Sequence, residues 1–395
     1  MKYIDEASVS HKTVLLRVDF NVALNPNHSI ADDARIQQSL PTLTYLLMHH
    51  NKLILVAHLG EPTKRNAADS LSRVANRLRR YLPNNKITLV DDFLKEQDVF
   101  KEQKEGEILL LENIRFYPGE TTNDPRFAKQ LASLAEIYVD DAFGVAHRKH
   151  ASVVGIPQLL PSYGGLLLKK EISALELVIK HPRKPYVAII GGKKITTKIK
   201  FINKLTTIAD YLLLGGGLAN TFLTAQGHTL GASMISEEDL SLAKKILELA
   251  KREKTTIVLP KDFVVAKDKH DKTSLIKNSE TIQAHDEILD IGPETQADFG
   301  AIIGQARTII WNGPVGYIEN PLFKRGTDFL YYAITQNTNA VSIVGGGDTL
   351  AAIANKEYLD KLTHISTGGG AMLEFIENGT LPGIEALEKS PFARK

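Results

Sequence analysis

The chain has 395 residues, of which 43% are hydrophobic and 24% charged, the proportions of an ordinary folded protein. Its formal net charge of +2 is too small to indicate a nucleic-acid or membrane partner, and the lack of cysteine excludes disulfides, thiol nucleophiles and thiolate metal sites. The N-terminus lacks the apolar segment of a signal peptide and no apolar run is long enough for a membrane span, so we expect a cytoplasmic protein.

Short apolar runs alternate with amphipathic helical patterns in the first half of the chain. The runs predict buried strands at 12–20, 52–58, 107–112 and 136–143. Between them, apolar residues at helical spacing predict helices at 34–50, 69–82 and 124–135. Strand–helix alternation of this kind is typical of βαβ units with a parallel sheet.

The second half repeats this alternation. Strands are predicted at 185–190, 209–216, 255–260, 306–313, 339–346 and 362–367. Ser236, followed by three acidic residues, is predicted to be the N-cap of a helix that runs through Arg252. Two such series, in a chain too long for one core, predict two α/β domains.

A segment rich in Pro and Gly at 155–165 predicts the boundary between the domains. The helical pattern at 166–181 would then connect them. We therefore expect a first domain at 1–160, a connecting helix at 161–181 and a second domain at 182–380.

Three glycine triplets, each between a predicted strand and a predicted helix, occur in the second half, within 212–220, 343–350 and 364–372. Glycine lets a ligand approach the backbone, and a helix start offers unpaired N–H groups. Such loops bind anions, most often phosphate, although a single triplet could equally serve a plain turn. Three of them predict loops that converge on a polyphosphate.

Basic residues lie at the ends of the predicted strands of the first half or in the segments that follow them. They are Arg17, Arg35, His58, Arg115, His147 and Arg148. Arginine forks match carboxylate and phosphate oxygens, although any single arginine is more often in a surface ion pair. In the second half, Lys193 and Lys194 follow the strand at 185–190, where an ammonium could meet a phosphate or remain a surface charge.

Two acidic residues of the second half each have two possible roles. Asp348 at a helix start is either a helix cap or a ligand of Mg²⁺, which usually takes one carboxylate together with nucleotide oxygens. Glu319 could accept hydrogen bonds from ribose hydroxyls or be an ordinary loop acid.

Several nucleotide-enzyme motifs are missing. No GxxxxGK[ST] occurs and no triplet completes GxGxxG, which argues against a P-loop and against a nicotinamide dehydrogenase. "ADFG" at 297–300 lacks the accompanying HRDxxxxN and is a chance match to the kinase motif. Phosphoryl transfer to a carboxylate needs no general base, which suits a chain with many cations and no obvious nucleophile–base pair.

The chain resembles the phosphoglycerate kinase family. The resemblance lies in blocks that span nearly the whole chain in the family's order: "LLRVDFNVAL", "DDARI", "AHLGEP", "LLLENIRFYPGE", "VDDAFGVAHRKHAS", "AIIGGKKITTKI", "LGGGLANTF", "DIGPET", "IWNGPVGYIE", "VGGGDT", "STGGGA" and "LPGIEAL". It implies two doubly wound parallel-sheet, Rossmann-like domains joined by a helical hinge. It also implies reversible phosphoryl transfer from 1,3-bisphosphoglycerate to ADP in glycolysis, by a monomer with Mg²⁺.

The resemblance assigns site residues position by position. For 3-phosphoglycerate it implies Asp19, Phe20, Asn21, Arg35, His58, Leu59, Gly60, Arg115 and Arg148. For the transferring phosphoryl group it implies Arg35, Lys194, Gly368, Gly369 and Gly370. For the nucleotide, ATP or ADP, it implies Lys198, Gly292, Asn312, Glu319, Gly346, Gly347, Asp348 and Thr349, with Asp348 on Mg²⁺. The tail at 381–395 is expected to pack on the first domain.

Four positions depart from the family pattern. Glu61 stands where an arginine for the 3-phosphate is usual, and Lys193 replaces a small residue. Thr197 replaces an aspartate and Asp140 an asparagine. A nucleotide-binding protein that has lost catalysis is the main alternative, but Arg35, Lys194 and Asp348 are intact, which favours an enzyme.

Overall fold

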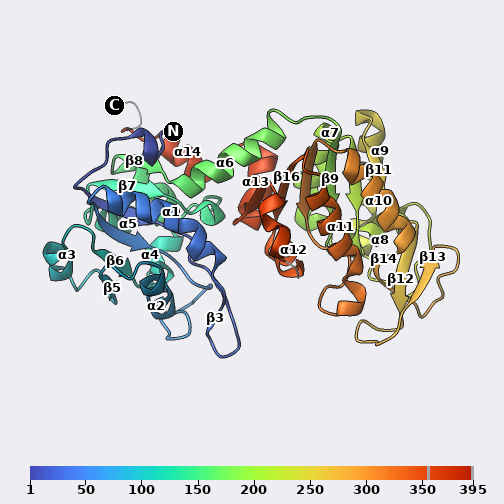
Figure 1. Ribbon diagram of the computed structural model, residues 1–395, viewed down its shortest axis with the longest axis horizontal. Helices are drawn as coiled ribbons and strands as arrows, with labels where there is room; N and C mark the ends of the chain where they lie inside the picture. The colour runs from blue at the N-terminus through green and yellow to red at the C-terminus, as the bar shows by residue number, and fades with distance from the viewer. Residues whose placement is uncertain (354–355, 393–395) are drawn as a thin grey trace. The chain divides into compact units, whose positions relative to one another are not determined.

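The computed structural model describes residues 1–353 and 356–392 of the chain. Its contacts divide the chain into two compact units: Met1–Ile172 with Thr380–Lys395, and Ser173–Gly379. Helix α6 (Leu166–Ile179) contains the point of division. Each unit is built around a six-stranded parallel sheet with helices beside it, which confirms the predicted fold class (Figure 1).

The sheet of the first unit is buried, and its strands are nearly continuous apolar runs, as expected for parallel strands covered on both faces. Strand β1 lies in the middle, with Leu15 in register with Ile54 on one side and Tyr138 on the other. In spatial order the strands are β5 (Ile87–Val90), β6 (Ile108–Leu111), β4 (Lys52–Val56), β1 (Thr13–Arg17), β7 (Ile137–Asp140) and β8 (Ser162–Gly164).

The helices of the first unit begin where the sequence offers caps. Asp124 accepts hydrogen bonds from the N–H groups of Arg126 and Phe127 at 2.8 and 2.9 Å, with Pro125 at the first helical position, so α5 begins there. The helices are α1 (Ala34–Met48), α2 (Ser72–Tyr81), α3 (Asp98–Glu102), α4 (Pro118–Thr121), α5 (Pro125–Ala132) and α14 (Pro382–Glu388).

Shorter elements complete this unit: the hairpin of β2 (Ala23–Leu24) and β3 (Ile30–Asp32), the 3₁₀ turns η1 (Ile4–Glu6), η2 (Ile114–Phe116), η3 (Phe143–Val145) and η5 (Ile156–Gln158), and the π turn η4 (Ala151–Gly155). Helix α14 is held by a hydrogen bond of 2.8 Å from Gly383 N–H to the Ala146 carbonyl oxygen. Residues 393–395 of the predicted tail lie outside the described residues.

The second unit has a parallel sheet of the same size and a smaller antiparallel one. The parallel strands are β11 (Thr256–Val258), β10 (Tyr211–Leu214), β9 (Tyr186–Ile190), β15 (Thr308–Asn312), β16 (Val341–Gly345) and β17 (His364–Ser366). The antiparallel strands are β13 (Leu275–Asn278), β12 (Asp262–Ala266) and β14 (Glu287–Ile291).

The helices of the second unit follow the strands. They are α7 (Ile199–Ile208), α8 (Gly216–Ala225), α9 (Leu240–Glu253), α10 (Pro293–Gln305), α11 (Arg325–Gln336), α12 (Gly347–Ala352) and α13 (Gly369–Asn378). The 3₁₀ turns are η6 (Thr196–Lys198), η7 (Glu237–Asp239), η8 (Pro321–Phe323) and η9 (Lys356–Lys361). Within the described ranges, no helix is long and apolar enough to cross a membrane.

Each predicted glycine triplet does connect a strand to a helix: β10 to α8, β16 to α12 and β17 to α13. The prediction for Ser236 was wrong. Its side chain makes no capping hydrogen bond, a 3₁₀ turn at Glu237–Asp239 follows it, and α9 begins only at Leu240. The antiparallel sheet was not predicted at all.

Candidate active site

The first unit gathers polar residues where its central strands end. Asp19 and Asn21 follow β1, and His58 and Gly60 follow the neighbouring strand β4. Because the carboxyl ends of parallel strands lie on one edge of the sheet, these residues share the edge where ligands bind in such folds.

Arg35, at the start of α1, forms an ion pair with Asp19. Its Nη1 lies 2.7 Å from Asp19 Oδ2, and the Asp19 side chain is almost fully buried whereas that of Arg35 is 34% exposed. Asp19 Oδ1 accepts a second hydrogen bond from Asn21 N–H at 3.1 Å. The carboxylate therefore fixes one edge of the guanidinium while part of it stays available to an anion.

The backbone of Gly60 is held from both sides by predicted substrate residues. Its N–H donates to Asn21 Oδ1 at 2.9 Å, and its carbonyl oxygen accepts from Arg115 Nη1 at 2.7 Å. Gly60 has φ +65°, a conformation that residues with a Cβ rarely adopt. These contacts bring Asn21, Gly60 and Arg115 together, as expected for one binding loop.

Glu61, the acidic departure from the family pattern, forms an ion pair with Arg115. The distance from Arg115 Nη1 to Glu61 Oε1 is 2.7 Å, with the arginine side chain 5% exposed and the glutamate 76% exposed. The carboxylate thus lies on a cation that was predicted to bind the substrate. Arg65, the next arginine along the chain after Glu61, forms an ion pair of its own in this structure, with its Nη1 2.7 Å from Asp91 Oδ1.

His58 is neutral and carries its proton on Nε2. Arg17, fully buried, places Nη2 3.3 Å from His58 Nδ1, and since a guanidinium can only donate, Nδ1 must accept. Burial, together with the charge of Arg17, lowers the pKa of His58 well below its ordinary value. Arg17 also donates from Nε to Ser152 Oγ at 3.0 Å, which fixes its plane.

The remaining predicted substrate residues differ in what they can offer. Arg148 follows η3 and is exposed, so its guanidinium is open to solvent. Phe20 and Leu59 are buried in the hydrophobic core, which leaves their backbone groups for a ligand.

In the second unit, the loop after β16 lies against the loop after β17. A Cβ on Gly369 would lie 2.9 Å from Gly346 Cα, and one on Gly346 would lie 2.8 Å from Asn312 Nδ2. Gly346 has φ +105° as well, so both conformation and space require glycine. The junctions from β16 to α12 and from β17 to α13 are therefore adjacent, and they contain the predicted residues Gly346, Gly347, Gly368, Gly369 and Gly370.

Asn312 and Thr349 hold this glycine loop from inside. Asn312 Nδ2 donates to the Gly345 carbonyl oxygen at 2.8 Å, and Thr349 Oγ1 donates to the same oxygen at 3.0 Å. Thr349 Oγ1 also accepts from Gly313 N–H at 2.7 Å, and its side chain is fully buried. Both residues support the loop in this structure.

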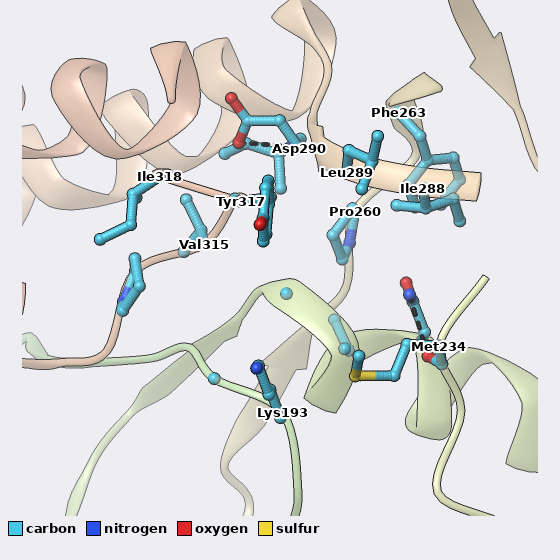
Figure 2. Close-up of a pocket in the computed structure, with 18 of the residues that line it drawn as sticks. Lys193, Met234, Pro260, Phe263, Ile288, Leu289, Asp290, Val315, Tyr317 and Ile318 are labelled. Carbon is cyan, nitrogen blue, oxygen red and sulfur yellow. Dashed lines mark hydrogen bonds between the residues drawn. The ribbon is translucent and has the colours of Figure 1, made fainter. Parts of the chain in front are cut away.

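A cavity of about 640 Å³ lies within the second unit (Figure 2). Its lining includes the apolar side chains of Met234, Pro260, Phe263, Ile288, Leu289 and Val315, the lysines Lys193, Lys194 and Lys198, and the acids Glu287, Asp290 and Glu319. Figure 2 shows Lys193 extending into the cavity from the turn after β9, across from Leu289 and Tyr317. An apolar cavity with cations in its lining fits a flat base joined to phosphates.

The turn after β9 holds its lysines in different ways. Lys198 Nζ donates to the Gly191 carbonyl oxygen at 2.9 Å. Lys194 Nζ lies 2.6 Å from Glu238 Oε1, and that hydrogen bond raises the pKa of Lys194. Neither Glu238 nor its neighbour Asp239 was singled out from the sequence, because both looked like ordinary acids of a first helical turn.

Two predicted nucleotide residues remain. Gly292 is the residue before α10, and its N–H donates to the Asp262 carbonyl oxygen at 2.8 Å. Asp348 is the second residue of α12, but its side chain lies outside the described residues, so its role as a Mg²⁺ ligand stays a prediction. Among the described residues, no group of three or more acidic, histidine or cysteine side chains could hold a metal ion.

Comparison with known proteins identifies the family. The family model for phosphoglycerate kinase matches residues 4–379. The chain belongs to the phosphoglycerate kinase family. Phosphoglycerate kinase of Koribacter versatilis is 46% identical over 97% of this chain and 98% of its own length, and that of Dictyoglomus turgidum is 47% identical over 95% and 96%.

Solved structures of family members agree with this fold. The structure of phosphoglycerate kinase from Coxiella burnetii has a TM-score of 0.87 at 37% identity and covers 98% of each chain. The structure from Pyrococcus horikoshii has a TM-score of 0.83 at 30% identity and covers 100% of each chain. The resemblance drawn from the sequence blocks is confirmed.

Proposed function

We propose that this chain catalyses reversible transfer of the 1-phosphoryl group of 1,3-bisphosphoglycerate to ADP, giving 3-phosphoglycerate and ATP, as its family membership implies. The observation that carries the proposal is the turn at 192–198, which brings Lys194 and Lys198 to the lining of an apolar-walled cavity large enough for a nucleotide. In glycolysis this step forms ATP.

The first unit would bind the phosphoglycerate. Arg35, Arg115 and Arg148 supply positive charge for its phosphate and carboxylate groups. His58, neutral with a proton on Nε2, adds a donor without adding charge. Asp19 and Asn21 orient Arg35 and the Gly60 loop rather than binding charge themselves.

The second unit would bind ATP or ADP. The apolar walls take the base, Glu319 accepts from the ribose, and the turn at 192–198 meets the phosphates. Backbone N–H groups at 346–347 and 368–370 would donate to phosphoryl oxygens, with Gly368 N–H first leaving Ser366 Oγ.

The chemistry needs charge neutralisation rather than proton transfer. The acceptor carboxylate of 3-phosphoglycerate is already ionised near neutral pH, so it attacks the terminal phosphorus directly as the bond from phosphorus to the ADP oxygen breaks. Lys194 and Arg35 stabilise the charge on the transferring oxygens. Mg²⁺, held by nucleotide oxygens and Asp348, would neutralise further phosphate charge.

The same proposal includes Mg²⁺ as a cofactor, a cytoplasmic location and a monomeric state. It also includes domain limits at 160, 181 and 380 and bending at the connecting helix. They rest on the sequence and on the family resemblance. The departures at Glu61, Lys193, Thr197 and Asp140 leave Arg35 and Lys194 in place.

A coupled assay tests the proposal. Purified protein with 3-phosphoglycerate, Mg·ATP, glyceraldehyde-3-phosphate dehydrogenase and NADH should oxidise NADH, and omission of either substrate should abolish the rate. A protein that binds Mg·ATP but gives no rate would favour the nucleotide-binding alternative without catalysis.

A further inference from the structure

Two consecutive acids, Glu238 and Asp239, contact the lysine turn from the 3₁₀ turn η7 before α9. Asp239 Oδ2 accepts from Ile195 N–H at 2.8 Å, and its Oδ1 accepts from Thr196 Oγ1 at 2.8 Å. Glu238 Oε1 lies 2.6 Å from Lys194 Nζ. One acid therefore holds the backbone of the turn, and the other holds its ammonium.

The two acids differ in burial, and this separates their roles. Asp239 is fully buried. Burial raises its pKa, but hydrogen bonds, those from Thr196 first among them, more than offset this and leave it below the ordinary value, so it stays ionised. The side chains of Glu238 and Lys194 are 66% and 54% exposed, so their ion pair is weak and can exchange partners.

Lys194 lines the cavity as well as contacting Glu238. An ammonium on a flexible stem can leave a single carboxylate for a phosphate, which carries more charge and more acceptor oxygens. The turn that carries it does not need to move, because Asp239 fixes Ile195 and Thr196. The structure thus shows a fixed turn that carries one side chain able to exchange partners.

We propose that Asp239 and Glu238 are positioning residues for Lys194: Asp239 fixes the turn, and Glu238 holds the ammonium until the terminal phosphate of the nucleotide replaces it. This rests on the proposed function, because it assigns the phosphate to ATP. Glu238 is accordingly a competitor of the ligand, and its removal strengthens binding.

The test compares Glu238→Gln with Glu237→Gln by calorimetric titration with Mg·ATP and Mg·ADP. Glu237 is exposed in the same 3₁₀ turn and, among the described residues, shows no ion pair, so its variant removes the same charge without touching Lys194. We expect Glu238→Gln to lower the Kd for Mg·ATP roughly 1.5- to five-fold, the range for an exposed ion pair. Glu237→Gln should change the Kd for Mg·ATP less than Glu238→Gln does. Glu238→Gln should change the Kd for Mg·ADP less than the Kd for Mg·ATP.

A double-mutant cycle makes the test specific to Lys194. On a Lys194→Met background, Glu238→Gln should have no effect on the Kd for Mg·ATP, because the competing pair no longer exists. An equal effect of Glu238→Gln with and without Lys194, or equal effects of Glu238→Gln and Glu237→Gln, would overturn the inference while leaving the proposed function intact. Failure of the unmutated protein to bind Mg·ATP would overturn both.

The role of Asp239 is tested through its hydroxyl partner. Thr196→Val removes the hydroxyl hydrogen bond to Asp239 Oδ1 and leaves the backbone N–H groups of Ile195 and Thr196 donating to Oδ2, whereas Thr196→Ser keeps all three. We expect Thr196→Val to lower kcat several-fold with KM for 3-phosphoglycerate unchanged, and Thr196→Ser to restore kcat. Equal kcat values in folded Thr196→Val and unmutated protein would overturn the role assigned to the hydroxyl bond between Thr196 and Asp239.

Discussion

Replacement of Glu61 perturbs the substrate site at a single ion pair. In the structure, the Glu61 carboxylate lies 2.7 Å from Arg115 Nη1, and Arg115 is buried except for 5% of its side chain. A phosphate of 3-phosphoglycerate that binds Arg115 must displace this carboxylate or accept its repulsion. Glu61→Gln therefore should strengthen substrate binding without building any new contact.

The exposure of the Glu61 side chain sets the size of the expected change in KM. Two unit charges about 4 Å apart interact by about 4 kcal/mol at an effective dielectric of 20 and about 1 kcal/mol in water. Because Glu61 is 76% exposed, the lower figure applies, and exposed pairs are typically worth ~0.2–1 kcal/mol. We expect Glu61→Gln to lower KM for 3-phosphoglycerate up to roughly five-fold and Glu61→Arg, which adds a cation, roughly ten-fold.

The assay is the coupled reaction at saturating Mg·ATP, with 3-phosphoglycerate varied at low and high salt. KM for ATP should be unchanged, and the gain should shrink at high salt because screening weakens the charge term. Glu102→Gln, which removes an exposed acid elsewhere in the first unit, is the control. A KM for 3-phosphoglycerate that stays the same or rises in Glu61→Gln would refute the reasoning.

Lys194→Ala should lower kcat by roughly a hundred-fold or more, since one such donor supplies ~3–4 kcal/mol to the transition state, and a near-normal kcat would remove Lys194 from the chemistry. Small-angle scattering should show a smaller radius of gyration only with 3-phosphoglycerate and a Mg·nucleotide together, because the proposed function assigns the two substrates to different units, which must then approach for transfer. An unchanged radius of gyration counts against this prediction. Burial raises the pKa of Asp290 to about 8, above its unfolded value. Its contribution to the free energy of unfolding is therefore full at low pH and is lost as pH rises from about 4 to about 8. Urea unfolding of Asp290→Asn should show a flatter dependence of this free energy on pH over that window, and identical slopes for the variant and the unmutated protein would contradict the raised pKa.

The parallel sheets were predictable because their strands are apolar on both faces. β1 and β9 read as continuous apolar runs for this reason, and the glycine triplets marked strand–helix junctions correctly. The antiparallel sheet was not predictable in the same way. Its edge strand β13 exposes Leu275 and Ile276 by 62% and 61%, so the sequence shows neither a buried run nor a clean alternation.

Contacts across long stretches of sequence could not be predicted. The pairing of Arg115 with Glu61 joins residues 54 positions apart by number, and that of Lys194 with Glu238 joins residues 44 apart. In the sequence, Asp239 is typical of an acid at a helix start. In the structure its carboxylate accepts hydrogen bonds from Ile195 N–H and Thr196 Oγ1. Composition and local pattern fix which residues carry charge, whereas only the fold decides which charges meet.

The central claim is that this chain transfers a phosphoryl group to the carboxylate of 3-phosphoglycerate. Hydroxylamine tests it most directly, because it converts an acyl phosphate, but not a phosphate ester, into a hydroxamate. Protein incubated with 3-phosphoglycerate, Mg·ATP and hydroxylamine should form hydroxamate and ADP in equal amounts, and Lys194→Ala should form far less. ADP without hydroxamate, or hydroxamate formed equally well by Lys194→Ala, would contradict the account.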